Sequence, residues 1–442
     1  MNAPEIVIEI YPFLITFLYL CTFLVALFAY FMRAFMLYTG NRKIDNFLYG
    51  TMFTANTEKK HIGKICLYVF FLFLVSRILI LLIAEIGFAL DGKQNYLYDY
   101  RKFIFTQWDA PHYIGIAENG YVNEGDARLH IVFYPLFPFL IRLLNGFTGD
   151  SLISSAILSN TCLIAGGVFL YLICFDIYGK KIASLSAALF MFSMGTVFYS
   201  IPYTESLFFL LTVSCVYFAR KRRFCLALFL GALCSLTRLP GAITAVCVFF
   251  EMLRSKLGYI RRIGEKETRI RRALKVTTKS FSKCLLILTG FLIYLLINKA
   301  VTSDAFKFLE YQKNHWGQEA GNLYKTAEYS IRYLFYPFEK WYQYGVYLPQ
   351  CASILLVVLI LFFVKKNAHP GDLAYAVVYV LVTLSPTMLI SGPRYLSAMF
   401  PLYPFAAILM KKNRFAKVLI IAVWILFFIY SSYMYMVKWT YL

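Results

Sequence analysis

Long apolar runs, separated by short polar and charged segments, dominate this amino-acid sequence. Many of them approach the roughly 20 residues that a helix needs to cross a membrane. The pattern predicts an all-α polytopic membrane protein. We expect apolar spans at 12–39, 65–90, 151–177, 182–200, 204–219, 284–301, 347–364, 372–390, 395–410 and 415–437.

The stretch 224–253 is also apolar, but Arg238 and the Pro-Gly pair after it interrupt the run. Basic clusters flank this stretch at 220–223 and 251–283. Basic residues concentrate on the cytoplasmic side of membrane proteins, and both clusters stay there if two half-crossings meet at the break. With this broken helix, the chain is expected to have about eleven crossings.

The charged segments also assign a face to the loops. Segment 251–283 holds eleven basic residues and three acidic ones, whereas 91–128 holds six acidic and four basic. We therefore place the loops 91–150 and 302–346 on the extracytoplasmic side. The basic clusters expected on the cytoplasmic side lie at 40–64, 179–181, 220–223, 251–283, 365–366 and 411–417.

Composition agrees with a membrane protein. The 442 residues are 60% hydrophobic and 15% charged, whereas soluble domains are about 45–50% apolar and about 25% charged. The net charge of +21 would normally suggest a nucleic-acid partner. Because much of this charge lies between membrane spans, anionic lipid headgroups are the expected partners, and nucleic acid is not.

We expect one domain over residues 1–442, with 12–39 as an added N-terminal helix at its edge. This first run is too long for the core of a cleavable signal peptide, so it is expected to be retained. The ten cysteines contain no Cys-x-x-Cys pair, and a disulfide framework or a zinc site is not expected.

The first extracytoplasmic loop carries the most informative polar residues. Pro111 fits the first turn of a helix capped by Asp109, which places Asp109 and His112 on one face. Beside Trp108 at a membrane interface, a partly desolvated Asp109 gains basicity, as a general base for a sugar hydroxyl requires. A helix cap with an interfacial indole explains the same residues, and the local sequence favours neither interpretation.

The second loop combines Lys313, His315 and Trp316. A cation, an imidazole and an indole at this spacing suit a phosphate and a sugar ring. The alternative is an aromatic interface belt with solvated charges. His112, His130 and His315 are three of only five histidines, and all three are expected on the extracytoplasmic face, which favours function.

Three ionisable residues are expected at the outer ends of spans, namely Glu205, Arg238 and Arg394. Charges at membrane depth are costly and mark functional sites by default. Their placement predicts that they gather on the side that carries the two long loops.

Missing motifs narrow the chemistry. The sequence has no Walker A motif, no Gly-x-Gly-x-x-Gly and no Asp-x-Asp. A sugar donor would therefore be a lipid-borne monophosphate rather than a sugar nucleotide. Asp109, His112 and His130 could hold a metal, but their spacing is weak evidence, and we expect no metal or other cofactor.

The run Trp108-Asp109-x-x-His112, followed by His130-x-x-Phe133-Tyr134-Pro135, resembles the first lumenal loop of the PIG-V-type GPI mannosyltransferase II family. Later motifs follow in the family's order at 203–208, 237–241, 314–317 and 394–403. The run at 238–241 departs from the family's pattern. The preceding span 12–39 and the lack of an Asn-x-Ser/Thr sequon on any expected outer loop leave open a prokaryotic relative with a different acceptor.

The resemblance implies the GT-C glycosyltransferase architecture and transfer of mannose from dolichyl-phosphate-mannose outside the cytoplasm. It also implies that the Trp-Asp pair, Trp108 and Asp109, is functionally important. We therefore expect a polyprenyl-phosphate-dependent hexosyltransferase acting on a lipid-linked or glycolipid acceptor by a single inverting displacement, in a bacterial plasma membrane or the endoplasmic reticulum. A small membrane partner subunit is compatible with this expectation.

Each candidate residue then has an expected role. Asp109 would be the general base and Trp108 would form a wall of the sugar pocket, while Glu205 would bind acceptor hydroxyls. The residues expected to bind the donor phosphate or its sugar are His112, His130, Arg238, His315, Trp316 and Arg394.

Two other functions remain open. The broken helix at 238–241 is a feature of transport sites, which makes a transporter or flippase of lipid-linked sugars the main alternative. A non-catalytic assembly subunit that keeps the fold is the second. Replacement of Asp109 separates them, because only an enzyme would lose turnover while still folding.

Overall fold

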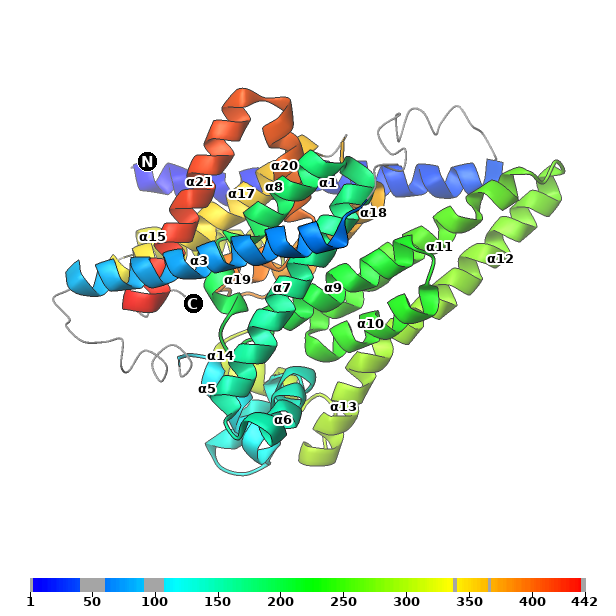
Figure 1. Ribbon diagram of the computed structural model, residues 1–442. Coiled ribbons are helices and arrows are strands. Elements are labelled where there is room, and N and C mark those ends of the chain that lie inside the picture. The colour runs from blue at the N-terminus through cyan, green and yellow to red at the C-terminus, as the bar shows by residue number, and fades with distance from the viewer. Residues whose placement is uncertain (1–2, 40–59, 91–106, 337–339, 365–366, 439–442) are drawn as a thin grey trace.

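The computed structural model describes residues 3–39, 60–90, 107–336, 340–364 and 367–438. These residues form helices joined by short turns (Figure 1), and their one β-type pairing is an isolated bridge between Ala320 and Pro386. The prediction of an all-α membrane protein is confirmed. Lys365, Lys366 and most of the basic cluster at 40–64 lie outside the described residues.

Six helical segments of the described chain are long and apolar enough to cross a membrane. The count becomes seven if the bent pair Asp126–Val132 and Leu136–Thr148, which turns by 111°, forms one span. The expected eleven crossings are therefore not confirmed. The helices that make up the six segments are α1 (Ala3–Thr39), α3 (Ile62–Leu90), α7 (Ser151–Tyr178), α12 (Lys266–Cys284) continued by α13 (Thr289–Thr302), α17 (Leu348–Val364) and α21 (Arg414–Tyr433).

Shorter helices occupy the interior between these segments. Several expected spans are divided among them: the run 182–200 stays α-helical only to Met191, and 395–410 is shared by two helices. Backbone at membrane depth tolerates such turns where protein surrounds it. These interior helices are α8 (Lys180–Met191), α9 (Glu205–Arg220), α10 (Phe224–Thr237), α11 (Thr244–Arg261), α18 (Pro370–Thr383), α19 (Gly392–Ser397) and α20 (Leu402–Lys412), with the single-turn η3 (Thr196–Tyr199).

The helix break expected at Arg238 is present. Helix α10 ends at Thr237, the 3-10 turn η4 (Leu239–Ile243) follows, and α11 begins at Thr244 and packs beside α10. Gly241 makes this return possible, because a Cβ there would lie 2.2 Å from the carbonyl oxygen of Cys234.

Helices α5, α6 and α14 lie close together near one end of α13 (Figure 1). Helix α5 packs against α6 and η2, and α14 contacts both η2 and α13. The first loop thus meets the second, as the functional interpretation requires. The elements of this group are α5 (Ala110–Asn119), η2 (Asp126–Val132), α6 (Leu136–Thr148) and α14 (Lys307–Trp316), and α15 (Leu323–Phe335) and α16 (Lys340–Tyr342) follow them in the chain.

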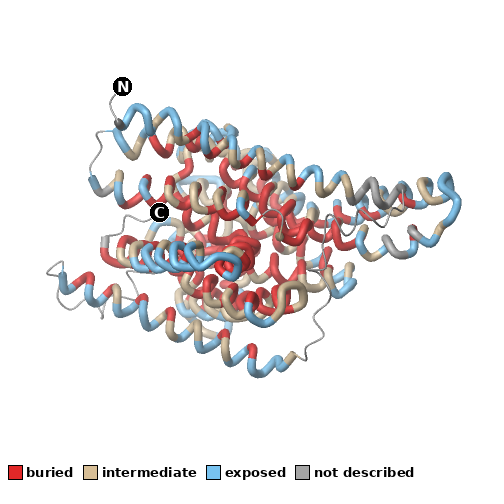
Figure 2. Tube along the Cα trace, turned by 90° about the horizontal axis from the view of Figure 1, so that it is seen from above, coloured by how far each residue is buried: buried red, intermediate tan, exposed pale blue. Residues whose placement is uncertain are grey.

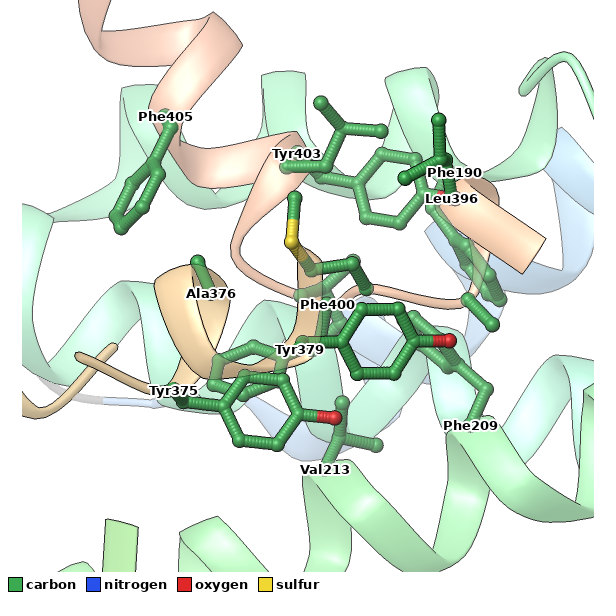
Figure 3. Packing of buried hydrophobic residues seen from close by; sticks show 14 of the residues in the cluster. Phe190, Phe209, Val213, Tyr375, Ala376, Tyr379, Leu396, Phe400, Tyr403 and Phe405 are labelled. Carbon is green, nitrogen blue, oxygen red and sulfur yellow. The ribbon is translucent and has the colours of Figure 1, made fainter. Parts of the chain in front are cut away.

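Buried residues concentrate in the interior, whereas the outer helices expose one side (Figure 2). Figure 3 shows an aromatic part of this core, in which the rings of Phe190 and Phe209 stack with centroids 4.0 Å apart and Tyr403 meets Phe190 edge-on. Large apolar side chains such as Leu67 (70% exposed) cover the outward side of α3. Apolar surface on this scale suits contact with lipid.

Helix α1, which contains the expected N-terminal span, is fixed to the interior by tyrosine hydroxyls. Tyr11 donates to the carbonyl of Cys351 at 2.7 Å, and Tyr19 donates to that of Val377 at 3.1 Å. These bonds join α1 to α17 and α18, so α1 is packed against the interior helices. The single-domain organisation stays a prediction.

Candidate active site

Asp109 stands at the N-cap position of α5, and Pro111 lies in the first turn, as expected. Its side chain makes no capping hydrogen bond. Tyr203 holds the backbone instead, because its hydroxyl accepts from the Asp109 amide and donates to the carbonyl of Gln107, both at 3.2 Å. The carboxylate of Asp109 is therefore directed elsewhere than into its own helix.

That carboxylate pairs with Arg394. Nη1 of Arg394 donates to Oδ2 of Asp109 at 2.6 Å, and Nε of the same arginine donates to Oε1 of Glu205 at 2.5 Å. Nη1 of Arg238 donates to that same Glu205 oxygen at 2.5 Å. Two carboxylates and two guanidinium groups thus form one continuous, formally neutral network.

The network is largely buried. Glu205 is 0% exposed and Arg394 is 5% exposed. Charges removed from water are tolerated only when they are paired and hydrogen-bonded, so each member depends on the others. Aromatic rings hold the guanidinium groups as well: the Tyr203 ring centre lies 4.3 Å from Cζ of Arg394, and that of Tyr395 lies 4.8 Å from Cζ of Arg238.

The local backbone at Arg238 and Arg394 places both side chains in the network. Arg238 occupies the break between α10 and η4, where its extended backbone leaves the helical path. Arg394 lies in the short α19, whose first amide, that of Gly392, donates to Oε1 of Gln350 at 2.5 Å. A Pro-Gly pair in η4 follows Arg238 at the break, and a Gly-Pro pair begins α19 just before Arg394.

A cavity of about 210 Å³ opens beside the network. Of the residues proposed from the sequence, Asp109, Arg238, Trp316 and Arg394 line it. The complete lining consists of Asp109, Tyr113, Val132, Phe133, Tyr134, Thr237, Arg238, Leu239, Pro240, Gln312, Trp316, Gln318, Arg394 and Tyr395. The first loop, the broken helix, the second loop and α19 therefore meet at one place.

Five proposed residues are absent from the lining of the cavity: Trp108, His112, His130, Glu205 and His315. Glu205 lies behind the arginines and is completely buried, so its expected binding of acceptor hydroxyls is not supported; it is a counter-ion for Arg238 and Arg394 instead. Trp108 adopts a left-handed backbone conformation (φ 54°), is 41% exposed and is not part of the lining. Its expected role as a sugar-pocket wall has no support in this geometry.

The histidines form a layer next to the cavity. The rings of His112 and His130 lie 5.0 Å apart, and His112 stacks on Phe133, which lines the cavity, at 4.8 Å. Burial lowers the pKa of His112 below its ordinary 6.5, an effect that Asp109 partly opposes. A neutral His112 would not neutralise a phosphate, which argues against the charge role expected for it.

His315 and Trp316 lie at the end of α14. His315 is exposed and its ring is 6.3 Å from that of Trp316, which itself meets Phe133 edge-on at 6.2 Å. Only Trp316 of this pair lines the cavity. Among the described residues, no group of three or more His, Cys, Asp and Glu side chains could hold a metal ion, so Asp109, His112 and His130 do not form such a group.

Sequence reasoning assigned no role to Gln312, Gln318, Thr237, Tyr113 or Tyr395, although all line the cavity. Tyr395 directly follows Arg394 and Thr237 directly precedes Arg238, so adjacency to a charged residue at a helix break could have suggested both. No signal in the sequence distinguishes Gln312 and Gln318, because their role depends on how α14 docks.

Residues 94–298 match the family model described as Mannosyltransferase (PIG-V). Two relatives named GPI alpha-1,6-mannosyltransferase 2, from Rattus norvegicus and Mus musculus, are each 33% identical over 120 residues, which is 25% of this chain and 24% of the relative. The chain thus spans about a quarter of the length of the curated relatives it matches.

Solved structures of an Archaeoglobus fulgidus oligosaccharyltransferase are also similar. The complex with zinc and sulfate has a TM-score of 0.39 and 13% identity, over 82% of this chain and 52% of that one. AglB with an inhibitory peptide and a dolichol-phosphate has a TM-score of 0.37 and 12% identity, over 70% and 48%. The resemblance to PIG-V mannosyltransferases expected from the sequence is confirmed over residues 94–298, where this chain matches that family.

Proposed function

We propose that the protein is a mannosyltransferase that moves a hexose from a polyprenyl-phosphate sugar to a glycolipid acceptor, similar to a glycosylphosphatidylinositol precursor, on the extracytoplasmic side. The observation that carries this proposal is the network of Asp109, Arg394, Glu205 and Arg238 beside one cavity. It combines a carboxylate suited to accept a proton with two cations suited to a phosphate. The GT-C architecture is part of the same proposal.

The arginines account for the donor end of the reaction. Guanidinium groups bind phosphate oxygens through charge-assisted, often bidentate hydrogen bonds. Arg238 and Arg394 both line the cavity, and Glu205 holds both from behind. They would bind the donor phosphate and stabilise the negative charge that grows on it as the bond to the sugar breaks.

Asp109 accounts for the acceptor end. The acceptor hydroxyl oxygen forms a bond to the anomeric carbon of the hexose while the bond from that carbon to the phosphate oxygen breaks. The hydroxyl proton passes to the Asp109 carboxylate, and polyprenyl phosphate leaves with the electron pair. One displacement of this kind inverts the anomeric configuration.

The ion pair between Arg394 and Asp109 suggests how the base becomes available. In the structure Asp109 shares its Oδ2 with Nη1 of Arg394. A donor phosphate that competes for Arg394 would weaken this bond, which leaves the carboxylate free to accept a proton. Donor binding would then precede activation of the acceptor, so an acceptor alone would not be deprotonated.

The transporter alternative loses its main support in this arrangement. The broken helix that suggested it brings Arg238 to the same cavity as Asp109. The expectation that no cofactor is needed stays a prediction, and so does a small partner subunit.

Purified protein in detergent, supplied with radiolabelled polyprenyl-phosphate-mannose and a membrane glycolipid extract, tests the proposal. We expect label to appear in a new glycolipid with inverted anomeric configuration. Movement of the intact labelled donor across a liposome bilayer, with no label transferred, would contradict it and favour the transporter.

A further inference from the structure

The cavity has two chemically different ends. The residues Asp109, Arg238 and Arg394 make one end charged. Gln312, Trp316 and Gln318 line the same cavity from α14 and the turn that follows it, and they carry no charge. We call these three residues the carboxamide end.

Hydrogen bonds fix the backbone of the carboxamide end. Helix α14 stops at Gly317 in a left-handed conformation (φ 63°), and the amide of Gln318 donates to the carbonyl of Gln312 at 3.1 Å. This bond closes the helix end and places both glutamines in one hydrogen-bonded turn.

The segment beyond this turn is docked on the chain just before Arg394. The amide of Gly321 donates to the carbonyl of Ser385 at 2.8 Å, and that of Thr387 donates to the carbonyl of Glu319 at 3.0 Å. Trp316 is held by its edge-on contact with Phe133. The backbone bonds and the aromatic contact thus hold the carboxamide end in place at the cavity.

The chemistry of the carboxamide end selects a neutral, hydroxyl-rich ligand. A primary amide both donates and accepts, as each sugar hydroxyl does, and an indole packs on the apolar C–H face of a sugar ring. Lys313, the neighbouring cation, is exposed and pairs with Glu319 at 3.1 Å. Among the described lining residues, this end therefore provides no cation to balance the charge of a phosphate.

We propose that Gln312, Trp316 and Gln318 form the binding subsite for the acceptor sugar, the neutral hexoside of a glycolipid whose hydroxyl attacks the donor. This inference rests on the proposed function, since a hexoside at the carboxamide end directs a hydroxyl toward Asp109. It makes the second loop the determinant of which acceptor is used, whereas the arginines determine the donor.

Steady-state kinetics with polyprenyl-phosphate-mannose as donor and octyl α-mannoside as acceptor test the subsite. We expect Gln312→Ala and Gln318→Ala each to raise the KM for octyl mannoside about tenfold, the effect of roughly 1.4 kcal/mol of lost binding. The KM for the donor should stay within a factor of about two. Asn314→Ala, an exposed residue of the same helix outside the cavity lining, is the matched control.

Two kinetic outcomes would overturn the inference. An equal rise in the KM for the donor would assign the carboxamide end to the donor sugar, and an unchanged KM for the acceptor in both glutamine variants would remove it from the site. Thermal unfolding of each variant is compared with that of Asn314→Ala, so that misfolding is recognised.

A binding measurement separates this inference from the proposed function. Saturation-transfer NMR with methyl α-mannoside reports sugar binding without any turnover. We expect a signal with the wild-type protein and with Asn314→Ala, and its loss in Gln312→Ala and Gln318→Ala. A signal that survives both glutamine substitutions, or that is absent from the wild type, contradicts the subsite even if transfer activity is found.

Discussion

Nη1 of Arg394 lies 2.6 Å from Oδ2 of Asp109, although 285 positions separate the two residues in the sequence. This contact joins the N-cap of α5 to the short helix α19. It also gives the carboxylate a fixed direction, which the N-cap position of Asp109 alone would not.

The two hydrogen bonds of Arg394 predict that transfer activity depends on the shape of its guanidinium group as well as on its charge. Its planar fork serves Asp109 and Glu205 at once, whereas the ammonium of Arg394→Lys is a point charge that cannot reproduce both bonds. We expect kcat/KM for transfer to fall about tenfold or more, as for loss of roughly 1.4 kcal/mol of transition-state stabilisation. Arg332→Lys, on an exposed pair with Glu328, is the control; equal activity of the two variants would show that charge alone suffices.

Glu205 is predicted to stabilise the fold by pairing with two arginines. In Glu205→Gln, Arg238 and Arg394 lose the charge that compensates their burial, at a cost of about 3–5 kcal/mol. We expect a clearly lower midpoint of thermal unfolding, with Glu310→Gln, an exposed i, i+3 partner of Lys307, close to wild type. An unchanged midpoint with a raised KM for the acceptor would restore the acceptor-binding role.

Gly241 is predicted to control the position of Arg238. A Cβ at this position would lie 2.2 Å from a backbone carbonyl oxygen, so Gly241→Ala has to displace η4, with a typical overpacking cost of about 1–3 kcal/mol. We expect lower thermal stability and a raised KM for the donor. Gly146→Ala, where no atom lies within 4 Å of the new Cβ, should leave both unchanged; equal behaviour of the two variants would contradict the close approach.

The lowered pKa of His112 predicts a pH dependence of stability. Because the folded protein binds this proton more weakly than the unfolded chain, the neutral form contributes stability above pH 6.5, and this contribution is lost as the pH falls below that value. The unfolding midpoint of the wild type should therefore fall more steeply below pH 6.5 than that of His112→Phe, which preserves the stacking on Phe133. Parallel curves for the two proteins would contradict this assignment.

Much of the fold and part of the site could be predicted from local sequence. The long apolar runs identify the outer helices, and the Pro-Gly pair after Arg238 marks the break that brings this arginine to the cavity. The interior spans could not be counted, because a buried turn such as η3 is as apolar as a helix. Composition does not distinguish the two.

Other parts of the site depend on long-range packing. Glu205 looked like a ligand-binding carboxylate because nothing in the sequence shows that two arginines enclose it. Conversely, nothing in the sequence marks Gln312 and Gln318. They reach the cavity because the chain after α14 is hydrogen-bonded to residues 385–387. Single charged residues beside a helix break were found by sequence reasoning, and residues that depend on docking were not.

The central claim is that Asp109 accepts the proton of the attacking hydroxyl, and transfer by Asp109→Asn tests it most directly. Wild type, Asp109→Asn and Asp126→Asn, an exposed control outside the cavity lining, are compared under saturating donor and acceptor. We predict that Asp109→Asn loses about 10²–10⁴-fold in kcat. It should still bind the donor at least as tightly as the control, because Arg394 no longer pairs with a competing carboxylate and keeps its bond to Glu205. Transfer by Asp109→Asn at the rate of the control would contradict the account.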